Sequence, residues 1–312
     1  MPRSNRQIVE RAAIDTSSVT YGLLSAEQAR QFLRQTFDAT NFRPLIRHEL
    51  RTAKTGEIDK IGIKSRILRS KVEGVDDGYR AQPEFGRIQY ATTAVRLPWE
   101  ITEETLRENI EGQNFESVVT DLMTTQLGID MEDLDLNGDT AVSASDPDYD
   151  FLKVNDGWIK QLEAGTHVED RTSKSSGAMS LDVFYSALKE LPNKYNNGNL
   201  RWVMSPRRYQ EWIYHILNQA VSNGGIITDG RIENPAAIPA VQCASMPDSK
   251  IILSDPKNFI EVATYDVKIR KTIEGKEAIM QDKRFYVVHL DFDPIIEELD
   301  AAVIIKGLAS IS

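Results

Sequence analysis

The sequence predicts an α+β protein in which helices are interspersed with pairs of strands. Three observations lead to this fold class. Apolar residues recur at helical spacing in several segments, the last quarter of the chain is rich in short β-type runs, and the two kinds of segment do not alternate regularly as in parallel βαβ folds. With 312 residues, 41% hydrophobic and 27% charged, the chain has the composition of a globular protein of about two domains.

The composition also limits where the chain is made. The longest apolar run, residues 301–305, is far shorter than the ~20 residues of a membrane-spanning helix. The first 25 residues contain no apolar signal-peptide segment, so we expect no secretion. A single cysteine, Cys243, and the absence of Asn-x-Ser/Thr sequons indicate synthesis in a reducing cytosol. We therefore expect no membrane partner.

The net charge of −10 is unevenly distributed. Residues 1–72 carry 14 Lys and Arg against 7 Asp and Glu, residues 73–150 carry 4 against 19, and residues 151–312 carry 19 against 21. Such an acidic chain does not favour sequence-specific nucleic-acid binding, which needs a basic surface. The basic and acidic segments either contact each other, within one chain or between copies, or are two unrelated solvated faces.

The basic segment contains a predicted helix and a predicted hairpin. Ser25 has capping-box spacing to Gln28 and opens a helix to about residue 38 with a single apolar stripe. The stripe consists of Ala29, Phe32, Leu33 and Phe37. Two extended segments, residues 58–63 and 88–99, then flank a turn-rich, charged stretch. This pattern predicts a long hairpin that projects from the body and needs a surface to lie on.

The acidic segment contains the longest predicted helix. Thr102 precedes two glutamates and caps a first helical stretch to about Gly112, and Asn114 caps a second. Apolar residues at intervals of one, three and four extend the second helix to about Leu134, roughly 20 residues or about 30 Å. We expect this helix to form the backbone of the fold.

The remainder is predicted to combine loops, two helices and strands. Residues 137–180 carry turn signals and short β-type runs. Ser180 caps a helix that Pro192 stops, and Ser205 with Pro206 starts another after a strand at residues 200–204. Residues 222–249 look irregular. Later strands are expected at residues 251–253, 259–263, 267–269, 285–291 and 301–305.

Nothing in the sequence points to a catalytic site. It has no G-x-G-x-x-G, P-loop, H-E-x-x-H or G-x-S-x-G pattern. Scattered histidines and a lone cysteine favour packing or surface roles; they are His48, His167, His215, His289 and Cys243. Acidic pairs are expected by chance in this chain; they are Glu103–Glu104, Glu297–Glu298 and Asp291 with Asp293. Two basic clusters favour solvated or intersubunit charge over DNA contacts; they are Arg207–Arg208 and Lys268, Arg270 and Lys271. We therefore predict no catalytic, cofactor-binding or metal-binding residues.

One sequence motif is compatible with a cation-binding site. Residues 133–139, DLDLNGD, match the first half of an EF-hand loop, with oxygen ligands at positions 1, 3 and 5 and glycine at position 6. Position 12 is Ala144 where a bidentate glutamate is needed, and no amphipathic helix follows directly. The pattern favours an acidic helix end followed by an Asn-Gly turn over calcium binding.

The order of these segments resembles the major capsid proteins of tailed bacteriophages, the Hong Kong 97-like family, over residues 25–308. The resemblance rests on motifs in sequence order: the arm helix SAEQARQFLRQTFD, the hairpin, LPWEITEETL before the long helix and EDLDLNGDT at its end, LRWVMSPRRYQEW, and the C-terminal segments SKIILSDPKNFIEVATYDVKIRK and RFYVVHLDFDPIIEELDAAVIIKG. It implies a Hong Kong 97-like capsid fold. Its expected parts are an N-terminal arm (1–50), an extended hairpin or E-loop (51–98), a peripheral domain with the spine helix (99–178), an axial domain (179–256), peripheral return strands (257–298) and a C-terminal axial strand (299–312).

The resemblance further implies a structural protein without enzymatic activity. Copies would assemble as pentamers and hexamers into the icosahedral head of a virion, built in the bacterial cytoplasm and enclosing double-stranded DNA without sequence-specific binding. Because the segment before Ser25 is short, either a separate scaffolding protein acts, which is the expectation here, or a scaffolding segment has been removed. A portal and decoration proteins are the other expected partners. The alternatives are the shell of an encapsulin nanocompartment, which shares the fold, a calcium-binding module using residues 133–139, and a hydrolase without a recognisable nucleophile.

The charge pattern adds a hypothesis about assembly. The basic segment 1–72 would lie on the acidic segment 73–150 of an adjacent copy, so assembly should depend on salt and on Arg30, Arg34, Arg43 and Arg47. Lysine crosslinks known in one branch of the family have no assigned position here, although the hairpin region contains Lys60, Lys64 and Lys71.

Overall fold

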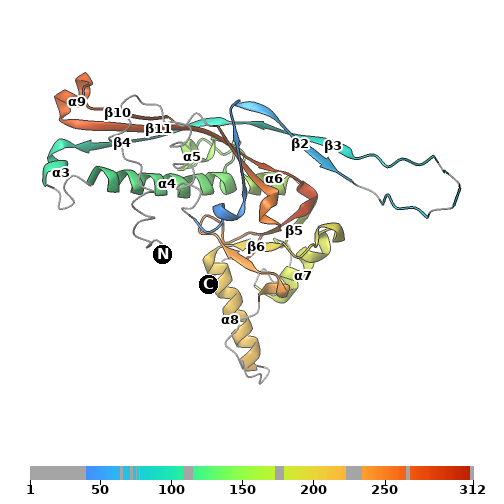
Figure 1. Ribbon diagram of the computed structural model, residues 1–312. Coiled ribbons are helices and arrows are strands. Elements are labelled where there is room, and N and C mark those ends of the chain that lie inside the picture. Colours follow the sequence, from blue (N-terminus) through green and yellow to red (C-terminus); the bar gives the residue numbers. More distant parts are fainter. Residues whose placement is uncertain are drawn as a thin grey trace, which may run out of the picture.

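The computed structural model describes residues 40–63, 66–70, 73–74, 76, 78–108, 115–172, 179–222, 234–264 and 268–309. Within them the chain forms two five-stranded sheets and a two-stranded hairpin, with helices packed on the sheets (Figure 1). The predicted α+β class is confirmed. The predicted arm helix at residues 25–38 lies outside the described residues.

The first sheet is long and carries the longest helix. Its strand order is β1-β9-β11-β10, and β4 pairs with the first part of β11. The strands are β1 (Arg47–Arg51), β4 (Thr93–Thr102), β9 (Phe259–Thr264), β10 (Lys268–Thr272) and β11 (Lys283–Ile296). Alternate residues of β4 and β11 point toward α4 (Phe115–Asn137), which runs along the sheet in Figure 1. Trp99 stacks on its cross-strand partner Tyr286, with ring centroids 5.2 Å apart, in this layer.

The start of α4 is tied to the same sheet by ion pairs. A short helix, α3 (Glu103–Glu108), precedes it. Arg284 on β11 pairs with Glu103 at 2.5 Å and with Glu116 at 2.8 Å, and Lys271 on β10 also pairs with Glu116. These contacts fix the helix along the strands at the end farthest from the second sheet.

The other end of α4 packs closely against the following loop. The helix has 23 residues and ends at Asn137, three residues later than the sequence predicts. A Cβ on Gly138 would lie 2.6 Å from the Asn155 carbonyl oxygen, and one on Gly157 would lie 2.6 Å from the Leu136 carbonyl oxygen. Glycine is therefore required where the Gly138 carbonyl accepts from the Gly157 N–H at 2.8 Å.

The second sheet has the order β5-β12-β8-β6-β7 and its own core. Its strands are β5 (Val168–Asp170), β6 (Arg201–Met204), β7 (Ala240–Gln242), β8 (Ile251–Ser254) and β12 (Ala302–Lys306). It packs against α7 (Leu181–Glu190) and α8 (Pro206–Ser222), and buries Phe184 in edge-on contact with both Trp202 and Trp212. Ser205 caps α8 as predicted, since its hydroxyl accepts from the Arg208 N–H at 3.2 Å.

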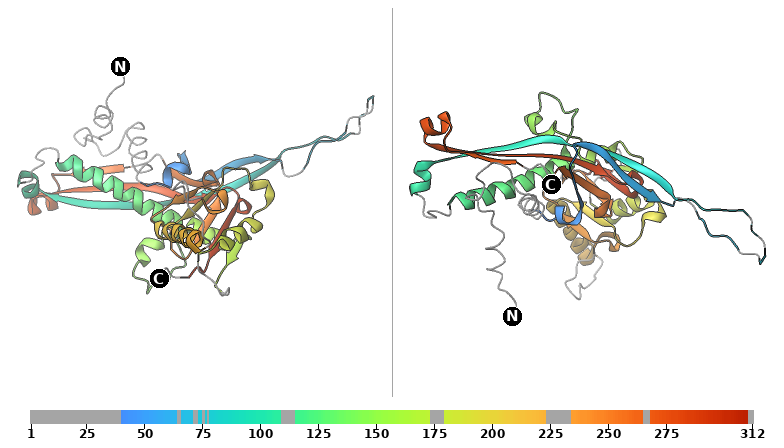
Figure 2. Two further views of the ribbon diagram at one scale, coloured as in Figure 1. Left: turned by 90° about the horizontal axis from the view of Figure 1, so that it is seen from below. Right: turned by 45° about the horizontal axis from the view of Figure 1, so that its top comes forward.

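The hairpin consists of β2 (Thr55–Gly62) and β3 (Glu84–Ala91). Both views of Figure 2 show it extending beyond the two larger sheets. At its base, Ile58 and Tyr90 are buried against Ile260, Val262 and Ile295 of the first sheet. The predicted projecting hairpin is thus present, anchored on one face near the body and free of it farther out.

Three local predictions are wrong. A single strand from residue 88 to 99 is instead β3 and β4, which separate at Thr92 because its N–H donates to the Lys54 carbonyl and turns the chain into the large sheet. Residues 137–180 contain short helices, α5 (Tyr149–Leu152) and α6 (Trp158–Glu163), and the irregular stretch contains β7.

The strand predicted at residues 285–291 spans 14 residues, because β11 pairs with β4 and β10 in its first part and with β9 in its second. Its register continues past Pro294, which stands opposite Glu261. The remaining short elements are α9 (Lys276–Gln281) and 3₁₀ turns at Arg43–Leu45, Asn193–Tyr195, Pro235–Ala237, Pro256–Asn258 and Leu299–Ala301. Among the described helices, none has the length and apolarity needed to cross a bilayer.

Candidate assembly surfaces

The sequence-level candidates for chemistry lie apart from one another. His48 is on β1, His167 precedes β5, His215 stacks on Trp212 in α8, and His289 is on β11. Cys243 is buried, and burial, together with nearby Glu132, raises the pKa of its thiol far above the usual range. Across the described ranges, no group of three or more His, Cys, Asp or Glu side chains is placed to hold a metal ion.

The three carboxylates of the partial EF-hand loop point to different partners. Asp133 accepts from the Asn137 side chain at 2.6 Å, Asp135 is buried beside Arg43, and Asp139 pairs with Lys160 at 2.5 Å. The segment is the last turn of α4 and the turn after it. Its oxygens therefore do not converge on one point, as a calcium ion would require.

The carboxylates of the acidic pairs also contact different partners. Glu297 pairs with Arg47 at 2.6 Å and Glu298 with Lys60, while Asp291 pairs with Lys54 at 3.0 Å. Glu297 and Glu298 line one pocket beside the hairpin, but each carboxylate pairs with a different cation. Their partners are cations of β1 and of the hairpin, which makes them structural braces.

The residues of the two basic clusters likewise contact separate partners. Arg208 is fully buried and donates to the carbonyl oxygens of Asp248 and Ala309 and to Glu211 at 2.5 Å, whereas Arg207 is largely exposed. Lys271 pairs with Glu116. The described side chains of these clusters do not form a continuous basic surface for a phosphate backbone.

A buried ion cluster joins the start of the described chain to the first sheet and to α4. Arg43 is 0% exposed and pairs with Glu261 on β9 at 2.6 Å and with Asp135 on α4 at 3.4 Å. Burial and the adjacent Glu261 hold the pKa of Asp135 well above its usual value, and the charge of Arg43 opposes that rise. His48 lies next to the cluster, 3.6 Å from Glu261.

This cluster places part of the predicted contact between segments 1–72 and 73–150 within one chain. Arg43 is sealed against Asp135 of its own chain, and Arg47 pairs with Glu49 and Glu297 of its own chain. Arg43 is fully buried and has no surface left for a neighbouring copy, whereas Arg47 keeps about one-third of its side chain exposed. Arg30, Arg34, Lys64 and Lys71 lie outside the described residues.

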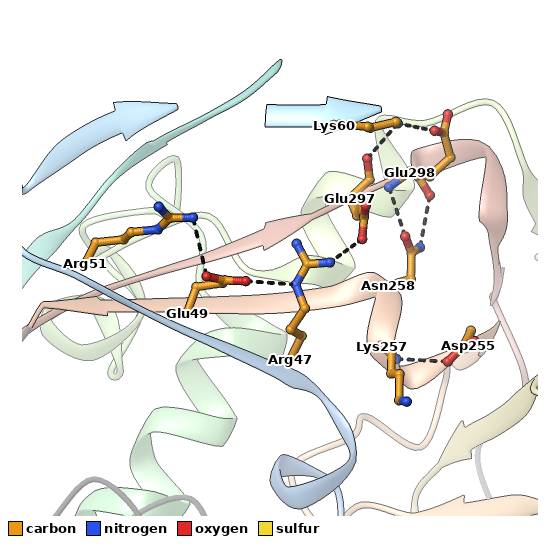
Figure 3. Close-up of polar contacts among 9 residues, drawn as sticks. All are labelled: Arg47, Glu49, Arg51, Lys60, Asp255, Lys257, Asn258, Glu297 and Glu298. Carbon is orange, nitrogen blue, oxygen red and sulfur yellow. Dashed lines mark hydrogen bonds and ion pairs between the residues drawn. The ribbon is translucent and has the colours of Figure 1, made fainter. Parts of the chain in front are cut away.

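Polar contacts brace the base of the hairpin (Figure 3). Lys60 on β2 reaches the carboxylate of Glu298 and the carbonyl oxygen of Glu297. Asn258 holds the same turn, because its amide donates to the Glu298 carbonyl at 3.0 Å and accepts from the Glu298 N–H at 2.9 Å. Since Arg47 on β1 also pairs with Glu297, the turn after β11 links the hairpin to the sheet edge. The brace fixes the direction in which the hairpin projects.

Asp293 on β11 provides a pH-sensitive contact at the same base. Its Oδ2 accepts from the Ala91 N–H at 2.8 Å, and burial raises the pKa of Asp293 to about 6. Because the pKa is higher in the folded than in the unfolded state, the protonated group favours folding fully below about pH 4. This contribution is lost as the pH rises through about 6.

We therefore expect Asp293→Asn, which keeps an acceptor without the charge, to be more stable than the wild type by about 1 kcal/mol at pH 8, after allowance for solvent screening, and equal at pH 4. Urea unfolding at both pH values measures this. Asp291→Asn is the control, because it removes the Lys54 ion pair and should gain nothing at pH 8. A gain for Asp293→Asn that is the same at both pH values would contradict the assignment.

The outer part of the hairpin exposes large apolar side chains. Ile61 and Phe85 are cross-strand partners on one face and are 69% and 75% exposed, and Leu68 near the tip is 95% exposed. The same face carries Arg87, which pairs with Glu57 at 3.0 Å and Asp59 at 3.3 Å. An isolated two-stranded ribbon gains little stability by itself in water. The exposed apolar side chains make this face of the hairpin a candidate contact surface for another molecule.

Two further ends of the molecule expose apolar residues. At the far end of the first sheet, these are Ile273, Ile279 and Met280 on and around α9. On the helices of the second sheet, they are Leu181, Tyr185, Tyr214 and Leu217. These three exposed apolar groups lie at separate extremities, which suits a subunit that contacts several neighbours at once.

Comparisons with known proteins agree with this arrangement. No family model matches the chain. A protein of Bacillus subtilis (strain 168), named provisionally as prophage capsid protein YqbE, is 26% identical over 324 residues, covering 97% of this chain and 98% of that protein.

Solved shells have a similar fold. The procapsid of satellite phage P4 with its size determination protein gives a TM-score of 0.65 at 15% identity, over 90% of this chain and 99% of that one. The capsid of an empty GTA particle gives 0.58 at 12% identity, over 95% of both chains. The SrpI encapsulin of Synechococcus elongatus PCC 7942 gives 0.52 at 11% identity, over 99% of this chain and 96% of that one. The chain therefore has the Hong Kong 97-like fold of tailed-bacteriophage major capsid proteins.

Proposed function

We propose that this chain is a major capsid protein whose copies assemble as pentamers and hexamers into the icosahedral head around phage double-stranded DNA. The observation that carries the proposal is the match to a prophage capsid protein over nearly the full length of both chains, together with the shared shell fold. The role is structural, and the chain needs no cofactor for it.

The geometry of a single copy supports assembly. The exposed apolar face of the hairpin, with Ile61 and Phe85, cannot be buried by the chain's own core, because the opposite face of the hairpin already packs there. Contact with a neighbouring copy would remove this apolar surface from water at about 25 cal/mol per Å². Repetition around a closed shell would multiply that gain.

The expected division into parts also stays a proposal. The first sheet with α4 corresponds to a peripheral domain, the second sheet with α7 and α8 to an axial domain, and residues 55–91 to the E-loop. One detail departs from the expected boundaries, since β5 at residues 168–170 pairs with β12 in the second sheet.

Further partners follow from the same proposal. We expect a separate scaffolding protein, a portal and decoration proteins, assembly in the host cytoplasm and residence in the virion. The net charge of −10 supports enclosure of DNA without sequence-specific binding, because an acidic chain has no excess of cations for phosphate.

An encapsulin shell is the second candidate, supported by the fold of the SrpI encapsulin. Both candidate proteins form closed shells, so the contents of the shell and the genes beside this one distinguish a phage head from an encapsulin. Portal and terminase genes beside this one indicate a phage head, whereas a cargo protein with a loading peptide indicates a nanocompartment.

The direct test is to express the full chain with and without its candidate scaffold and to examine gradient fractions by negative-stain electron microscopy. Closed shells or capsomers are expected. A homogeneous monomer at every salt concentration and with scaffold present would overturn the proposal.

A further inference from the structure

The long helix α4 has apolar residues on two opposite sides. One side packs on the first sheet through Leu127, Met131 and Leu134. On the other side Val118, Leu122 and Ile129 are 39%, 63% and 38% exposed. At 100° per residue these three and the exposed Thr125 fall within about 60° around the helix axis. We call these four residues the outer stripe of α4.

The described chain begins beside this stripe. Thr40 donates its hydroxyl hydrogen to Glu132, one turn beyond Ile129, and Arg43 is locked to Asp135. The preceding residues therefore start at the C-terminal end of the outer stripe. Toward the end of α4, Met131, Leu134 and Leu136 are already buried in the core, so only the N-terminal direction offers uncovered apolar surface.

Residues 25–38 match that surface in length. As a helix of 14 residues they would span about 21 Å, and the outer stripe from Val118 to Ile129 spans about 17 Å. Their own apolar stripe lies on one face; it consists of Ala29, Phe32, Leu33 and Phe37. Each of the two faces needs an apolar partner, and the tether at Thr40 holds them close together.

The charges are complementary as well. Asp121 lies beside the outer stripe of α4, and Arg30 and Arg34 lie together on one side of the apolar stripe of residues 25–38 at i,i+4 spacing. Like charges would oppose the contact, whereas this pairing favours it and makes it sensitive to salt.

We propose that residues 25–38 bind as a helix along the outer stripe of α4 in the same chain. With Thr40 fixed at Glu132, residue 33 lies beside Thr125 and residue 37 beside Ile129. This contact goes beyond the shell function and does not depend on it, since it concerns one copy only.

Disulfide formation tests the contact in the full-length chain. Leu33→Cys with Thr125→Cys is oxidised gently and analysed on a non-reducing gel. The matched control is Leu33→Cys with Tyr185→Cys, which places the second thiol on exposed α7. Native Cys243 is buried and its thiol pKa is raised, so it reacts slowly.

The first pair is expected to form an intrachain disulfide at least tenfold faster than the control. Equal rates for the two pairs would overturn the proposal, and so would a disulfide that forms only between chains, which assigns the outer stripe to a neighbouring copy.

A second measurement keeps the test independent of disulfide geometry. Leu122→Asp should increase tryptic cleavage after Arg30 and Arg34 about tenfold without changing thermal unfolding, because Leu122 is exposed on the body itself. Tyr185→Asp should leave cleavage unchanged. Equal cleavage in Leu122→Asp and wild type would contradict the contact.

Discussion

Replacing Arg43 with methionine is expected to lower the free energy of unfolding by about 3–5 kcal/mol at pH 8. Arg43 and its partners Asp135 and Glu261 are all 0% exposed, so the substitution leaves a charged carboxylate in the core without a counter-ion. Urea unfolding of the unassembled subunit, followed by tryptophan fluorescence, measures the loss.

The loss should be smaller at pH 5. Without Arg43 two carboxyl groups remain buried side by side, and burying them costs less free energy when the cluster takes up a proton. Arg47→Met is the matched control, because Arg47 is about one-third exposed and its removal should cost at most about 1 kcal/mol. An Arg43→Met subunit within 1 kcal/mol of the wild type at pH 8 would mean that the cluster does not depend on the arginine charge.

Phe85→Asp is expected to abolish shell formation while the subunit stays folded. Phe85 is 75% exposed, so the body loses little, but an interface would lose an aromatic contact of about 2–4 kcal/mol and gain a buried charge. Because every copy carries the change, the loss is repeated at each contact in the shell. Gradient sedimentation and electron microscopy should show unassembled subunits with unchanged circular dichroism.

The control for this experiment is Gln89→Asp. Gln89 lies on the same strand and the same face of the hairpin and is exposed, so it adds the same charge without removing an apolar contact. Shells are expected from Gln89→Asp. Shells from Phe85→Asp at wild-type yield would show that the hairpin face is not buried on assembly.

Local patterns in the sequence predict much of the fold. Ser205 and Pro206 mark the start of α8, and the apolar spacing after Asn114 predicts α4 to within three residues of its end. These predictions succeed because capping and helical periodicity act within a few turns. The helices α5 and α6, of 4 and 6 residues, are too short to show a helical period in the sequence. Helix α6 is held instead by the packing of its first residue, Trp158, in the core.

Long-range partners lie outside what local patterns can predict. Arg43 and Glu261 are 218 residues apart, and no local pattern links a basic arm residue to a carboxylate in a late strand. The charge asymmetry does predict that basic and acidic segments meet, and Arg43 with Asp135 is such a contact, but within one chain. The exposed hairpin face could be anticipated, because Ile61 and Ile63 alternate with polar residues in a segment flanked by turns.

The most direct test of the central claim is a cryo-electron microscopy map of the assembled particle that resolves side chains on the hairpin. The account predicts that Ile61 and Phe85, exposed in a single copy, are buried against a neighbouring copy in the shell. A shell in which both side chains face solvent, or a chain that forms no particle under any condition, would contradict it.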